Sequence, residues 1–117
     1  LITEVWYPAE LGSVGGAAKK TYDIRTKLPA SELEKIPDDK NPLQVCECYD
    51  DLPLDTEHGP YPVIVFNHGT AAWAAQSLSQ MQHWASRGFI VISADHPGLY
   101  LGAILCNFCG CQGGQQN

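Results

Sequence analysis

The chain has 117 residues, which suits one domain, and its 44% hydrophobic content is ordinary for a globular protein. Its formal net charge of −6 argues against nucleic acid as a partner, because phosphates require a basic surface. No run reaches the roughly 18 apolar residues of a membrane-spanning helix, so we expect no membrane span.

Residues 1–27 predict the early strands of a sheet. Leu1 to Tyr7 is rich in β-branched and aromatic residues and alternates in polarity, so we expect a strand that ends at Pro8. The Gly- and Ala-rich stretch from Leu11 to Lys20 predicts a loop, whose glycines lack the spacing of a phosphate-binding loop. Thr21 to Arg25 predicts a further short strand.

Residues 28–60 predict an acidic loop with one short helix. Ser31 and Glu34 have the spacing of a capping box, and the helix should end before Pro37. Repeated prolines then favour little regular structure up to residue 60. This stretch contains nine acidic residues, which we interpret as a solvated surface in preference to a cation site: Glu32, Glu34, Asp38, Asp39, Glu47, Asp50, Asp51, Asp55 and Glu57.

Residues 61–98 predict a strand–helix–strand unit, around which an α/β fold would be organised. Val63 to Phe66 and Phe89 to Ile92 are continuous apolar runs without alternation, which predicts strands covered on both faces. Two such strands joined by a helix should lie parallel, with a right-handed crossover. Gly88 suits the end of the helix, and one helical face would carry Leu78, Met81, Trp84 and Ala85.

The turn from Asn67 to Thr70 is the candidate functional element. It leaves the C-terminal end of a predicted parallel strand, where α/β sheets place their ligand sites, and leads toward a helix N-terminus with free backbone amides. Such amides can stabilise a developing oxyanion, and Gly69 would let the backbone approach a substrate closely.

At these residues the chain resembles the α/β-hydrolases. The similarity lies in the order VIVFNHG, WASRGF and VISADHPG, and it is closest to the dienelactone hydrolase and platelet-activating-factor acetylhydrolase-like branch of esterases and lipases. EVWYPAE is similar to the first strands of that branch. The resemblance covers residues 61–98 well and 1–10 loosely. It implies that residues 1–117 form the N-terminal portion of one α/β-hydrolase domain with a mixed sheet, and that 99–117 form a Cys- and Gly-rich tail.

The resemblance implies a carboxylic ester hydrolase that transfers an acyl group to a serine and then to water, without a cofactor, on an ester or lipid substrate. Thr70 would contribute an oxyanion-hole amide, with His68 and Gly69 supporting the turn and Trp73, Asp95 and His96 at the pocket rim. From the residues alone, we favour structural support for His68 and a packing role for Trp73. For residues 95–98 we favour a turn in which Asp95 bonds backbone amides.

The sequence departs from this family because it contains no G-x-S-x-G nucleophile elbow. In the family's order, the serine, the acid and the histidine all follow the strand ending near Ala94. We therefore expect the chain to be catalytically incomplete, with its triad in a missing C-terminal part or a companion chain. The absence of an initiator Met and of a signal segment also suggests a processed or truncated piece.

The five cysteines leave three alternatives open. Disulfides, free thiols and a metal site are each compatible with Cys46, Cys48, Cys106, Cys109 and Cys111. Disulfides would favour a secreted protein, and we assign no metal. The rival to the esterase hypothesis is a non-catalytic binding or assembly module that uses these cysteines for metal or cross-linking.

Overall fold

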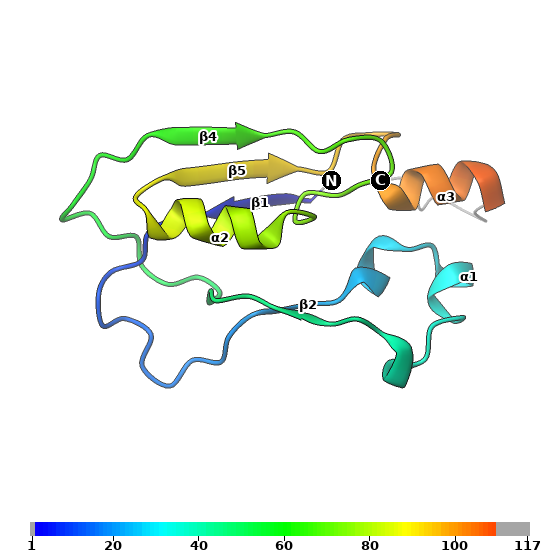
Figure 1. Cartoon of the computed structure of the whole chain (residues 1–117), viewed down its shortest axis with the longest axis horizontal. Coiled ribbons are helices and arrows are strands. Elements are labelled where there is room, and N and C mark those ends of the chain that lie inside the picture. Colours follow the sequence, from blue (N-terminus) through cyan, green and yellow to red (C-terminus); the bar gives the residue numbers. More distant parts are fainter. Residues whose placement is uncertain (1, 110–117) are drawn as a thin grey trace.

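The computed structural model of the chain describes residues 2–109, and its centre is a three-stranded mixed sheet in the order β1–β5–β4 (Figure 1). The strands are β1 (Thr3–Trp6), β4 (Val63–Phe66) and β5 (Ile90–Ala94). β1 runs antiparallel to β5, with Trp6 opposite Val91. β4 runs parallel to β5, with Val63 opposite Ile90. The first segment of the chain therefore adds a third strand to the predicted parallel pair.

The predicted strand–helix–strand unit is confirmed. α2 (Leu78–Ser86) joins β4 to β5, and it buries Leu78, Met81 and Ala85. Trp84 is partly buried and packs against the core. Gly88 follows the helix with a φ of 92°, a left-handed conformation that glycine adopts at little cost.

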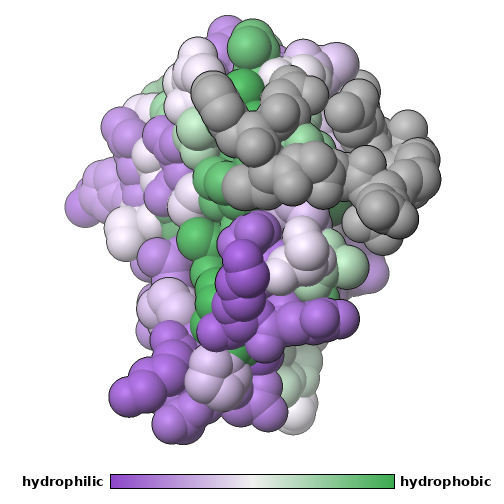
Figure 2. All heavy atoms as spheres, turned by 90° about the vertical axis from the view of Figure 1, so that its right-hand side faces the viewer, coloured by the Kyte–Doolittle hydropathy of each residue, from purple (hydrophilic) through white to green (hydrophobic). Residues whose placement is uncertain are grey.

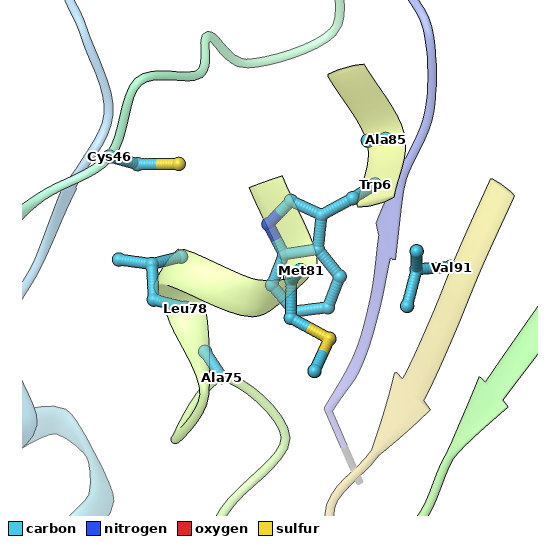
Figure 3. Packing of buried hydrophobic residues seen from close by; sticks show 7 residues of the cluster. All are labelled: Trp6, Cys46, Ala75, Leu78, Met81, Ala85 and Val91. Carbon is cyan, nitrogen blue, oxygen red and sulfur yellow. The ribbon is translucent and has the colours of Figure 1, made fainter. Parts of the chain in front are cut away.

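The core lies between α2 and one face of the sheet. Figure 3 shows Met81 of α2 beside the Trp6 indole of β1, with Val91 of β5 on one side of them and Leu78 and Cys46 on the other. Met81, Val91 and Cys46 have no exposed surface. The complete cluster consists of Trp6, Cys46, Ala75, Leu78, Met81, Ala85 and Val91.

The expectation that β4 is covered on both faces is wrong. Ile64 and Phe66 pack against the core, whereas Val63 and Val65 are 55% and 67% exposed. Val5 of β1 is likewise 48% exposed. α2 packs against one side of the sheet, and in residues 2–109 these outward-facing side chains lack such a cover. A continuous apolar run thus does not by itself show that both faces of a strand are buried.

A second, two-stranded sheet lies beside the core. β2 (Thr21–Tyr22) pairs antiparallel with β3 (Gln44–Val45). The strand predicted over residues 21–25 ends early, because the Asp23 side chain accepts a hydrogen bond from the Arg25 amide and caps a 3-10 helix. The intervening helices are η1 (Ile24–Lys27), α1 (Ala30–Leu33) and η2 (Asp38–Lys40).

The capping box predicted at Ser31 is wrong. α1 begins at Ala30, so Ser31 lies inside the helix, and no side chain caps it. Pro29 occupies the N-cap position with φ −61°, and the ring fixes this angle close to the helical value. The start of α1 is therefore determined by the backbone angle of Pro29 and not by a hydrogen bond from the Ser31 hydroxyl.

The tail contains a helix that its composition did not predict, α3 (Leu101–Cys109). Its sequence is uncharged and mostly apolar, but it is only nine residues long. Among the helices of residues 2–109, none is both long and apolar enough to cross a bilayer.

Replacing Met81 tests the position of the core. Met81→Ala would leave a cavity under the sheet and should lower the free energy of unfolding by about 2–5 kcal/mol, as measured by urea denaturation. Gln80→Ala, on the exposed face of the same helix, should change it by less than about 0.5 kcal/mol. Equal effects of the two substitutions would contradict this packing.

Candidate active site

The candidate site lies where the segments after β4 and β5 run side by side. The Ala71 amide donates to the Leu99 carbonyl at 2.8 Å, and the Leu101 amide donates to the Ala72 carbonyl at 2.8 Å. Both segments leave the C-terminal ends of parallel strands, where α/β sheets bind ligands. Figure 2 views this end of the molecule and shows a column of hydrophobic residues between hydrophilic ones.

His68 is a structural element of the turn. It is buried, and its Nδ1 lies 2.6 Å from the Gly69 carbonyl oxygen. Its Nε2 lies 2.9 Å from the His96 backbone nitrogen, which donates to it. Because a carbonyl can only accept and an amide can only donate, the proton of the neutral ring belongs on Nδ1. Both ring nitrogens are thereby occupied, and the ring ties the two segments together.

His96 also contributes its ring to this junction. The centroids of the His68 and His96 rings are 4.4 Å apart, with a tilt of 41°. His96 is half-buried, so the two histidines form a packed pair at the strand ends. The structure thus brings together His68, Gly69, Thr70, Asp95 and His96, as their positions in the sequence predicted.

The backbone at Thr70 is open. Thr70 is exposed, and no group of residues 2–109 accepts a hydrogen bond from its amide. A Cβ built on Gly69 would meet nothing within 4 Å, so the adjoining backbone is also accessible. Ala71 follows with a φ of 63°, a left-handed conformation that costs a non-glycine residue about 1–2 kcal/mol. Within the described residues, the Thr70 amide is therefore unpaired and lies next to a residue in a left-handed conformation.

Asp95 anchors the segment that follows this turn. It is 3% exposed, and its Oδ1 accepts a hydrogen bond from the Ala74 amide at 2.8 Å. Its Oδ2 lies 3.2 Å from Lys27 Nζ, in an ion pair whose side chains are 9% (Lys27) and 4% (Asp95) exposed. The Ser93 hydroxyl donates to the Ala74 carbonyl at 2.7 Å. β5 and η1 together thus fix the backbone around Ala74.

These contacts account for the polar side chains of Lys27, Ser93 and Asp95. The amide bonding expected for Asp95 is confirmed, although its partner is 21 residues away and not in its own turn. Lys27 was not predicted, because a single lysine in a loop gives no signal of burial. Ser93 carries a weak signal, since it interrupts a buried apolar strand. Trp73 is half-buried and packs against the core.

Two of the cysteines form a disulfide with each other. Cys46 and Cys48 are bonded, with their Cα atoms 5.0 Å apart, and Cys46 is fully buried. Cys106 is also disulfide-bonded. Of the three alternatives (disulfides, free thiols and a metal site), these three cysteines therefore form disulfides. The Cys109 side chain and Cys111 lie outside the part of the chain whose side chains the structure describes.

A group of possible metal ligands lies before β4, away from the turn that follows it. Ligand atoms of Asp55, Glu57 and His58 lie within 4.8 Å of one another and could hold a metal ion. His58 Nδ1 is already 2.8 Å from Asp55 Oδ2, and the hydrogen bond and charge of Asp55 raise the pKa of His58. Asp55 is only 9% exposed, which departs from the solvated surface expected of the acidic stretch.

The protonation of His68 can be tested directly by NMR. Two-bond proton–nitrogen correlations at neutral pH should show the Nδ1–H tautomer, because Nε2 accepts from His96. The exposed His83 serves as the reference ring. Detection of an Nε2-bound proton on His68 would show that the two segments are not joined in this way.

The ion pair of Lys27 and Asp95 predicts a large effect of a small substitution. Asp95→Asn keeps an acceptor for Ala74 but leaves Lys27 buried without a counter-charge, which should lower the free energy of unfolding by about 3–5 kcal/mol. Adding Lys27→Met should restore most of that loss. Lys35→Met, which breaks the more exposed pair with Glu32, should cost less than about 1 kcal/mol. Urea denaturation distinguishes the variants, and no rescue by Lys27→Met would contradict the pairing.

Comparison with known families bears out the resemblance noted in the sequence. The family model of platelet-activating factor acetylhydrolase, isoform II, matches residues 41–109, which is more than half of the chain and includes the turn from Asn67 to Thr70. Searches of curated proteins and of solved structures find no match. The chain therefore belongs to the family of platelet-activating factor acetylhydrolase, isoform II.

Proposed function

We propose that the chain is part of an esterase or phospholipase-type hydrolase and supplies the Thr70 amide to its oxyanion hole. The observation that carries the proposal is the unpaired Thr70 amide at the C-terminal end of β4, in a chain of this family. Acyl transfer places negative charge on the former carbonyl oxygen, and a preorganised amide stabilises that charge.

The surroundings of Thr70 support such a role because they restrict the turn. His68 bonds both its own turn and the segment after β5, while Asp95 and Ser93 hold the peptide at Ala74. A donor fixed in advance needs little reorganisation when the charge develops. Gly69 leaves room beside it for a substrate carbonyl.

In this proposal, the nucleophile, the acid and the base lie outside these 117 residues. The sequence contains no G-x-S-x-G, and Ser93 and Asp95 are engaged by Ala74 and Lys27. The nucleophile, acid and base then come from further sequence or from a companion chain. The substrate is a carboxylic ester, free or in a lipid, and the reaction requires no cofactor.

The rival function, an assembly module that uses its cysteines, receives no specific support. Cys46 and Cys48 satisfy each other within the chain, so neither is available to a metal or to a partner's thiol.

The esterase assignment is tested on the protein isolated from its source, so that any completing sequence is present. It should hydrolyse p-nitrophenyl acetate and react with a labelled fluorophosphonate, and prior labelling should abolish hydrolysis. Protein that does neither is not a serine esterase.

The role of Thr70 is tested in the same complete protein. Thr70→Pro removes the amide hydrogen and should lower kcat/KM by about 10²–10³-fold. Thr70→Ala retains the amide and should change kcat/KM only a few-fold. Because proline can also disturb the backbone, an amide-to-ester replacement at residue 70 provides an independent removal of the donor. Full activity of the ester variant would exclude this amide from the oxyanion hole.

A further inference from the structure

Outside the turn, a cavity of about 500 Å³ lies beneath β1. Its walls come from β1 and the residues after it, from the β2–β3 side and from the end of α2, elements that lie next to each other in Figure 1. No residue of the turn after β4 or of the segment after β5 lines it. The volume falls in the range of small-molecule sites, about 300–1,000 Å³.

The cavity combines aromatic rings with an excess of carboxylates. Trp6, Tyr7, Tyr22 and Tyr49 supply the rings, and Val14 and Leu52 add aliphatic surface. Four carboxylates line it, those of Glu4, Glu47, Asp50 and Asp51, against the single amine of Lys20. Apolar walls with a few polar groups are typical of ligand pockets.

Two of these carboxylates form no ion pair with a described residue, although the charges of both act on the nearby Lys20. Asp50 pairs with Lys20 at 2.8 Å, and Glu47 pairs with Lys19 at 2.7 Å. None of the ion pairs within residues 2–109 includes Glu4 or Asp51. Glu4 is half-buried and has the Tyr22 hydroxyl at 3.4 Å.

Lys20 and Tyr22 lie close to the carboxylates of this cavity. Lys20 Nζ lies 5.2 Å from the centroid of the Tyr22 ring, a cation–π arrangement. Its hydrogen bond to Asp50, followed by the charge of Glu4, raises the pKa of Lys20. Burial, followed by the charge of Glu4, raises the pKa of Tyr22. Both shifts favour the protonated form, and the negative charge of Glu4 contributes to each of them after the larger cause.

We propose that this cavity binds a small organic cation, with its ammonium group between Glu4 and Asp51 and its apolar part against the aromatic walls. A cation is favoured because the carboxylates of Glu4 and Asp51 would repel an anion. A neutral ligand would gain no charge–charge attraction from them. An apolar arm is favoured because a bare metal ion would leave the rings unused. The site is separate from the Thr70 turn, so its occupancy does not depend on ester hydrolysis.

The test is a binding titration of the full chain with 2-phenylethylammonium, followed by amide NMR shifts. The ammonium should bind measurably, while 2-phenylethanol and phenylacetate should bind at least about tenfold more weakly. The shifts should concentrate at Lys20, Tyr22 and Asp51 and spare Thr70. Added salt should weaken binding of the ammonium, since part of the attraction is electrostatic. Equal affinity for the alcohol and the ammonium would overturn the proposal.

Charge-neutral variants locate the binding carboxylates. Glu4→Gln and, independently, Asp51→Asn should each raise the dissociation constant of the ammonium about tenfold. Glu34→Gln removes the same charge from the exposed end of α1 and should leave the affinity unchanged. If Glu4→Gln perturbs β1, the affinity of Asp51→Asn still tests the proposal, because Asp51 lies in an exposed loop outside the sheet. An equal loss in Glu34→Gln would show attraction to net charge instead of a site.

Discussion

The buried ion pair between Lys27 and Asp95 is the interaction on which the arrangement of the strand ends depends. It joins η1, an early segment, to the residue that follows the central strand β5. Asp95 uses its other oxygen to hold the Ala74 amide, so one carboxylate fixes both the approach to α2 and the position of η1. Such a pair adds little net stability when compared with an apolar replacement. Its effect is to specify one geometry.

The turn around Thr70 combines restraint with accessibility. Its neighbours are tied down by His68, Ser93 and Asp95, while Thr70 and Gly69 face outward. Ala71 adopts a left-handed conformation at the centre of these restraints. Strained residues of this kind persist only where the surrounding contacts determine the backbone. Figure 1 places the turn at the same end as α3, opposite the loop that leads into β4.

Sequence patterns predicted the elements whose signals are local and periodic. The spacing of Leu78, Met81 and Ala85 located α2, and the apolar runs located β4 and β5. The family resemblance was confirmed over residues 41–109. Position along the strands also placed His68, Thr70 and Asp95 at one edge.

Features that depend on distant partners could not be predicted in this way. The burial of Lys27 depends on Asp95, 68 residues away, and the exposure of Val63 and Val65 depends on what packs over β4. Ser31 has the sequence of a capping residue, yet Pro29 determines the helix start because its ring fixes the backbone angle. Propensity describes a residue and its neighbours, whereas these outcomes are set by tertiary contacts.

The exposed valines of β4 have a practical consequence for work on the isolated chain. Within residues 2–109, β4 pairs with β5 alone, so its other backbone edge and its outward side chains are both available for contact. An apolar edge strand is a template for pairing between copies. Concentration-dependent association would therefore mimic ligand-induced shifts at millimolar protein. Titrations are best performed after a dilution series has established the range in which the chain stays monomeric.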